Sequence, residues 1–116
     1  TFYFDESDFA WRVMETGKKN FILATAVTHH FNALAQDDQV ALRELGINAP
    51  WRAYYLAHNR FKFAWRHFTL YQALSVTFVF APLAATYYVM VALRNRRPDI
   101  AWAYLKGTIR GMLGLK

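Results

Sequence analysis

Apolar residues recur at helical spacing near the start of the chain, directly after an acidic turn at residues 5–8. They are Phe9, Ala10, Val13 and Met14. Gly17 follows, and glycine is the residue type that most often ends a helix. Residues 1–4 are apolar and aromatic, which favours a buried segment or a short strand. Residues 21–28 alternate loosely and are rich in β-forming residues, so we expect a strand there.

Helical patterns dominate the second half of the chain. Residues 31–48 are polar and mixed, which predicts a loop with one helical turn. A helix is expected to start at Pro50, because proline is tolerated in the first helical turn. Its aromatic residues fall on one broad face: Trp51, Tyr54, Tyr55, His58, Phe61, Trp65 and Phe68. After a break at residues 95–98, Asp99 is expected to cap a last helix that runs toward Gly111.

Residues 68–93 contain no charged residue, and a membrane span needs roughly 20 residues. Arginine and lysine flank the stretch on both sides, so the flanking charges give no inside–outside bias. Pro82 near the centre and several polar residues argue against a simple span. Three arrangements stay open: a span, a helical hairpin bent at Pro82 within one leaflet, and packing on a protein partner.

Charge is distributed unevenly and changes the expected partner. Residues 1–57 hold five Lys/Arg and seven Asp/Glu, whereas residues 58–116 hold nine Lys/Arg and a single acid. A basic half indicates an anionic partner, and the apolar stretch favours a membrane over nucleic acid. The chain has no cysteine, which excludes disulfides and thiolate metal sites. Its 116 residues are enough for one domain.

Three acids, Asp5, Glu6 and Asp8, lie at the start of the first expected helix. Acids are favourable there because the helix N-terminus carries unpaired N–H groups and partial positive charge. The functional alternative is a carboxylate that takes a proton from an attacking hydroxyl group. Neighbouring carboxylates raise each other's pKa, which helps to tune such a base.

A histidine pair, His29 and His30, closes the expected strand. A histidine at a strand end is more often a hydrogen-bonded structural residue than a metal ligand. Strand alternation directs the two side chains to opposite faces. Imidazole suits Mn²⁺ better than Mg²⁺, which prefers oxygen ligands.

The order of these motifs resembles family 2 glycosyltransferases. The matching elements are Phe4, Asp5-Glu6, Ser7, Asp8, Phe9-Ala10-Trp11, Arg12, Gly17, the expected strand at residues 21–28 and His30. Residues 51–67 also resemble the family's segment after the catalytic histidine, with His58 in place of an arginine. The Asp-Glu pair departs from the family's usual Glu-Asp or Asp-Asp.

The resemblance implies a role for individual residues. Glu6 corresponds to the general base, and Asp5 would share that role or shape the acceptor site. His30 would help to hold a divalent metal, Mg²⁺ or Mn²⁺, on the donor diphosphate. Four further residues are candidates for binding the acceptor or the diphosphate: Asp8, Tyr55, Asn59 and Arg60. Periodicity does not settle which of those on the Pro50 helix face the site.

The fold that the resemblance implies is the α/β GT-A fold, which is Rossmann-like. This chain would be its C-terminal portion, mainly α-helical with one or two strands. Residues 1–49 would end the catalytic domain on the acceptor side, and residues 50–116 would form a helical, membrane-associating region. No Asp-x-Asp motif occurs, so the donor-binding half of the enzyme is expected to be missing.

The implied activity is inverting transfer of a sugar from a nucleotide-sugar donor to a glycan or lipid-linked acceptor. The expected location is the cytoplasmic face of the cell membrane. The competing hypothesis is a small basic membrane-binding helical protein without catalysis, in which the acidic turn is only a helix cap.

Overall fold

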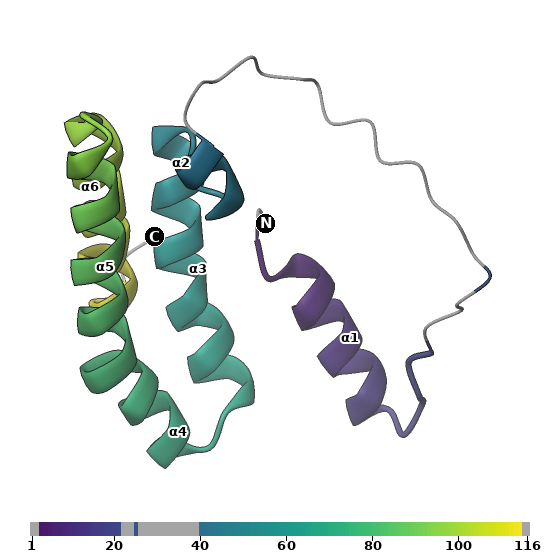
Figure 1. The fold of residues 1–116 in the computed structure, drawn as a ribbon. Helices are drawn as coiled ribbons and strands as arrows, with labels where there is room; N and C mark the ends of the chain where they lie inside the picture. The colour runs from purple at the N-terminus through teal and green to yellow at the C-terminus, as the bar shows by residue number, and fades with distance from the viewer. Residues whose placement is uncertain (1–2, 22–24, 26–39, 115–116) are drawn as a thin grey trace.

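A computed structural model describes residues 3–21, 25 and 40–114 of the chain. These residues form helices and no strand, so the expected α/β GT-A fold is wrong for this part of the chain (Figure 1). The elements are α1 Asp5–Glu15, α2 Val40–Glu44, α3 Pro50–His67, α4 Leu70–Ser75, the π-helical segment η1 Val76–Phe80, α5 Ala81–Arg94 and α6 Pro98–Met112. The strand expected over residues 21–28 and both histidines of the pair lie outside the described residues, apart from Phe21 and Thr25.

The segment before α1 is not extended, contrary to the expected short strand. Tyr3 and Phe4 both have positive φ, 59° and 64°, which is the left-handed region and incompatible with a β-strand. The Tyr3 hydroxyl donates a hydrogen bond of 2.6 Å to the Gly46 carbonyl oxygen, just after α2. This bond ties the start of the chain to a segment 43 residues later.

Close packing of α3 on α6 forms the centre of the molecule. A Cβ atom at Gly107 would collide with the Tyr54 carbonyl, and one at Gly111 would collide with the Phe61 ring. Three of the six residues that α3 buries are alanines; the full set is Ala53, Ala57, His58, Asn59, Phe61 and Ala64. The glycines on α6 and the alanines on α3 allow the two backbones to approach closely.

The aromatic face expected for α3 is only partly buried. Trp51, Tyr55 and Trp65 are exposed, whereas Phe61 is fully buried. Alanines occupy much of the contact with α6, and the Phe61 ring fits there because Gly111 has no Cβ. Large side chains fill the core elsewhere, including Leu42 and Ile47 around α2, a region that the sequence predicts as mainly loop.

Helix α5 packs on the other side of α6 through small residues and one aromatic pair. Tyr88 stacks on Tyr104 with ring centroids 4.6 Å apart, and Ala85 and Ala92 are buried beside them. The Tyr104 hydroxyl accepts a hydrogen bond of 3.0 Å from Arg60, which links this layer to α3. Burial raises the pKa of Tyr104, so its hydroxyl remains protonated at neutral pH.

Residues 70–94 form one continuous helix, so the hairpin bent at Pro82 is wrong. Thr69 and Gln72 start the helix with a capping box, in which each side chain accepts a hydrogen bond from the other residue's backbone N–H. Pro82 has no N–H and its ring would clash with the carbonyl four residues earlier. The wider η1 turn lies directly before it, where Ala81 N–H bonds to Val76 O instead. The π turn accommodates the proline and the helix continues.

Candidate functional site

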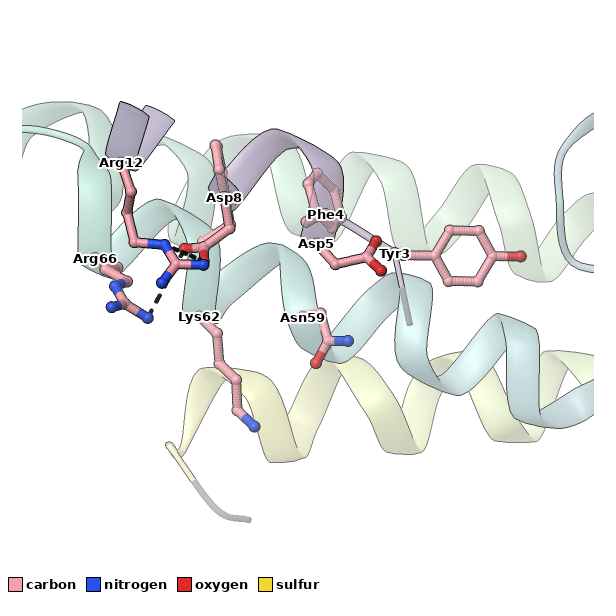
Figure 2. A pocket seen from close by; sticks show the side chains of 9 residues that line it. Tyr3, Phe4, Asp5, Asp8, Arg12, Asn59, Lys62 and Arg66 are labelled. Carbon is pink, nitrogen blue, oxygen red and sulfur yellow. Dashed lines mark ion pairs between the residues drawn. The ribbon is translucent and has the colours of Figure 1, made fainter. Parts of the chain in front are cut away.

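A pocket of about 260 Å³ lies between the start of α1 and the middle of α3 (Figure 2). Carboxylate, amide and cationic side chains surround it. The lining residues are Tyr3, Phe4, Asp5, Asp8, Arg12, Asn59, Lys62, Phe63 and Arg66.

Aromatic contacts hold α1 in place beside α3. The Phe4 ring stacks on Phe63 at 5.5 Å, and Trp11 meets Phe63 edge-on at 6.1 Å and His67 at 5.5 Å. None of the residues in α1 is fully buried. These rings, together with the ion pairs described next, therefore carry the contact between α1 and α3.

Asp8 is the polar anchor of that contact. Its carboxylate accepts a 2.6 Å hydrogen bond from His67 Nε2, lies 3.1 Å from Arg12 Nε and lies 3.8 Å from Arg66 Nη1. The His67 hydrogen bond is the largest cause that lowers the pKa of Asp8, and Arg66 and Arg12 lower it further against the opposing effect of burial. Asp8 is held as a carboxylate with its oxygens engaged, which suits an orienting role better than that of a proton acceptor.

His67 is enclosed by both helices. Its side chain is only 1% exposed, and its Nδ1 makes no hydrogen bond to any described residue, although Glu15 Oε1 lies 3.5 Å away. Because a carboxylate can only accept, Nε2 carries the hydrogen that Asp8 receives. His67 thus fastens the first turn of α1 to the last turn of α3.

Three of the residues predicted to form the site meet in this pocket: Asp5, Asp8 and Asn59. Asn59 is 3% exposed and forms part of the floor, with His58 Nδ1 at 3.2 Å from its Oδ1. Figure 2 draws Asp5 and Asn59 on facing elements, with the carboxylate of Asp5 over the side of α3 that carries the amide. Two motifs more than fifty positions apart in the sequence therefore line one cavity.

Glu6, expected to be the general base, is exposed and does not line the pocket. Successive helical residues point about 100° apart, so Asp5 and Glu6 cannot both face α3. Asp5 is the one that does. In this arrangement Asp5 is the better candidate base.

Tyr55 and Arg60 lie elsewhere on α3. Tyr55 is 42% exposed and meets the Tyr54 ring edge-on. Arg60 donates to Tyr104 and its guanidinium lies 5.0 Å above the Phe80 ring. Arg60 thus joins α3 to α6 and η1 and does not reach the pocket.

Lys62 and Arg66 line the pocket but were not predicted as site residues. They follow Asn59 at positions i+3 and i+7, so the three share one face of α3. Their helical spacing from Asn59 could have identified both residues as neighbours of the site. The aromatic residues instead led to a different face of this helix being expected to pack on the rest of the protein. Lys62 makes no ion pair with any described residue, whereas Arg66 approaches Asp8.

The expected metal site gains no support from the described residues. His30 lies outside them, and within residues 3–21 and 40–114 no three His, Cys, Asp or Glu side chains gather as a metal ion would require. The residues of the pocket do not fit a divalent cation, because Asp8 is already paired with His67 and arginines. No chemical step below depends on a metal.

Comparison of the chain with protein-family models, with curated proteins and with solved structures found no match.

Proposed function

We propose that the pocket between α1 and α3 binds the acceptor in an inverting glycosyl transfer from a nucleotide sugar. The observation that carries the proposal is the meeting of Asp5 and Asn59 in one cavity. The resemblance to glycosyltransferases implies that Asp5 serves the acceptor and that Asn59 binds the acceptor or the diphosphate. A cavity of about 260 Å³ with an open mouth accommodates a sugar ring, and its polar lining suits hydroxyl groups.

In the proposed reaction the Asp5 carboxylate accepts the proton of an acceptor hydroxyl group. The freed oxygen lone pair forms a bond to the anomeric carbon of the donor sugar. The bond between that carbon and the diphosphate oxygen breaks, and its electron pair leaves with the nucleoside diphosphate. Attack opposite the leaving group inverts the configuration at the anomeric carbon.

The remaining residues of the pocket contact the acceptor, balance the charge of the diphosphate and hold Asp5 in position. Asn59 lines the pocket with a polar amide, a group type that suits contact with acceptor hydroxyls. Lys62 supplies a cation at the rim, where it is suited to the negative charge of the leaving diphosphate. Asp8 keeps the turn that carries Asp5 against α3 through His67.

The test is sugar transfer from a panel of nucleotide sugars to glycan and lipid-linked acceptors, using the protein in the full form that its gene encodes. We expect one donor to give product, with the anomeric configuration opposite to that of the donor. Product of retained configuration would contradict the mechanism. An absence of transfer with every donor and acceptor pair would contradict the proposed function.

A further inference from the structure

One face of the continuous helix from α4 to α5 is strongly apolar and is not covered by the described residues. Only 28% of its most apolar stretch is buried by the described residues. The large apolar residues that are more than half exposed run along its length: Leu70, Tyr71, Phe78, Val79, Phe80, Leu83, Tyr87, Met90 and Leu93. A soluble surface seldom carries an apolar patch of this extent without a partner.

The charges around this face indicate what covers it. Arg66 precedes the helix, Arg94 is its last residue and Arg96 follows it; all three are exposed. The only acid in residues 58–116 is Asp99, which already pairs with Arg97 at 2.8 Å. Pairing with a second copy of the chain in either orientation would bring arginines together, because both ends are cationic. Anionic lipid headgroups complement both ends at once.

The packing of the opposite face decides between a span and an in-plane position. That face lies on α6 through Ala85, Ala92 and the Tyr88–Tyr104 stack, and α6 in turn packs on α3. Charged residues are distributed along these two helices: Arg52, Arg60, Lys62, Arg66, Asp99, Lys106 and Arg110. A helix that crossed the bilayer would carry these charges into the hydrocarbon, where charged side chains are costly.

We propose that the helix from α4 to α5 lies in the plane of an anionic bilayer and inserts its exposed face into one leaflet. The helices α3 and α6 then remain on the aqueous side, and the terminal arginines lie at headgroup level. This inference does not depend on the proposed catalysis, since it rests on a different surface.

Vesicle flotation tests the binding. We expect the chain to float with vesicles of mixed phosphatidylglycerol and phosphatidylcholine and to float at least tenfold less with pure phosphatidylcholine. Leu83→Glu should weaken binding to the anionic vesicles about tenfold or more, because it places a charge in the inserted face. Met14→Glu is the matched control, since Met14 is similarly exposed but belongs to α1, and it should bind as the original chain does.

Cysteine labelling tests the orientation, and the chain has no cysteine of its own. Variants with Arg66→Cys, Arg94→Cys or Leu83→Cys are added to the outside of sealed anionic vesicles and treated with a membrane-impermeant maleimide. We expect the two flanking sites to react and the Leu83 site to be protected. Met14→Cys should react with and without vesicles.

Three results would overturn the proposal. Protection of one flanking site and not the other would indicate a span. A monomeric chain that does not float with anionic vesicles would exclude lipid as the partner. A dimer that does not float, and that Leu83→Glu converts to a monomer, would show that a second copy covers the face.

Discussion

Among the acids of the first turn of α1, Asp5 and Asp8 serve different purposes because of their neighbours. Asp8 is fixed by His67 and two arginines, whereas Asp5 lines the cavity and makes no ion pair with the described residues. The same short motif thus divides into one group that builds the site and one group that is available for chemistry. Glu6 is exposed and does not line the pocket.

The ion pairs of Asp8 predict an acid-sensitive contribution to stability. Its pKa in the folded chain lies below that in the unfolded chain, which is about 3.9. Asp8 therefore stabilises the fold above about pH 4, and this stabilisation is lost as pH falls through the lower, folded pKa. Asp8→Asn should be less stable than the original chain at neutral pH, and the difference should shrink below about pH 4. Urea midpoints measured across this range check the prediction.

The control for that titration is Glu6→Gln, which removes an exposed acid from the same turn. Its urea midpoint should follow that of the original chain at each pH. A difference for Asp8→Asn that stays constant down to about pH 3 would contradict the role given to the His67 hydrogen bond.

The hydrogen bond between Arg60 and Tyr104 gives a second prediction at this scale. Tyr104→Phe removes the buried acceptor while keeping the ring stack on Tyr88, so the free energy of unfolding should fall by about 1 kcal/mol. Tyr87→Phe removes a hydroxyl from a ring that is 52% exposed. It should change the free energy of unfolding by less than about 0.5 kcal/mol. Equal effects of the two substitutions in denaturant unfolding would show that the Arg60 bond contributes nothing.

At the level of elements, the contact between α3 and α6 depends on two glycines in α6, although glycine has a low helix propensity. Gly107 and Gly111 lie one turn apart on α6 and both face the backbone or a ring of α3. Each glycine in a helix interior costs about 1 kcal/mol relative to alanine. The close approach of the two helices must offset this cost.

Replacing Gly107 with alanine should therefore destabilise the protein despite the better helix propensity. The added Cβ would meet the Tyr54 carbonyl, and overpacking of this kind typically costs about 1–3 kcal/mol. Lys106→Ala, at the neighbouring exposed position of the same helix, should change stability by less than about 0.5 kcal/mol. Thermal unfolding of both variants is the measurement; a more stable Gly107→Ala protein would contradict the close packing.

The sequence predicted the first residues of two helices best. Pro50 begins α3 as expected, and the acidic turn begins α1, because both signals are local. Asp99 was expected to cap the last helix, but the N-cap is Arg97 and Asp99 lies in the first turn of α6. The continuous helix through Pro82 was not predictable, since the π turn that accommodates the proline has no local signature. The burial of alanines in α3 depends on glycines about fifty residues away, which periodicity within one helix does not reveal.

At the scale of the whole molecule, α3 connects the two surfaces of interest. In the view of Figure 1, α1 and α5 flank α3 on opposite sides. The pocket uses the face of α3 that carries Asn59, Lys62 and Arg66, whereas the face with the alanines packs on α6. Arg66 belongs to both surfaces, so the catalytic and the membrane proposals are tested separately at residues that belong to one surface alone, such as Asp5 and Leu83.

Sequence motifs predicted part of the candidate site. Asp5, Asp8 and Asn59 belong to motifs that were identified by residue type, and the fold brings them together. Glu6 and Arg60 were candidates for the same reason, but their direction depends on helix rotation, which residue type does not determine. Arg60 in particular turns toward Tyr104 because that buried hydroxyl offers an acceptor.

The most direct test of the central claim compares Asp5→Asn with Glu6→Gln in the sugar-transfer assay. Both substitutions keep side-chain size and remove one carboxylate from the same turn. Asp5→Asn should lower the transfer rate by about 10²–10⁴-fold, the usual contribution of a general base, while Glu6→Gln keeps a near-normal rate. Loss of activity in Glu6→Gln with full activity in Asp5→Asn would contradict the assignment of the pocket as the site of proton transfer.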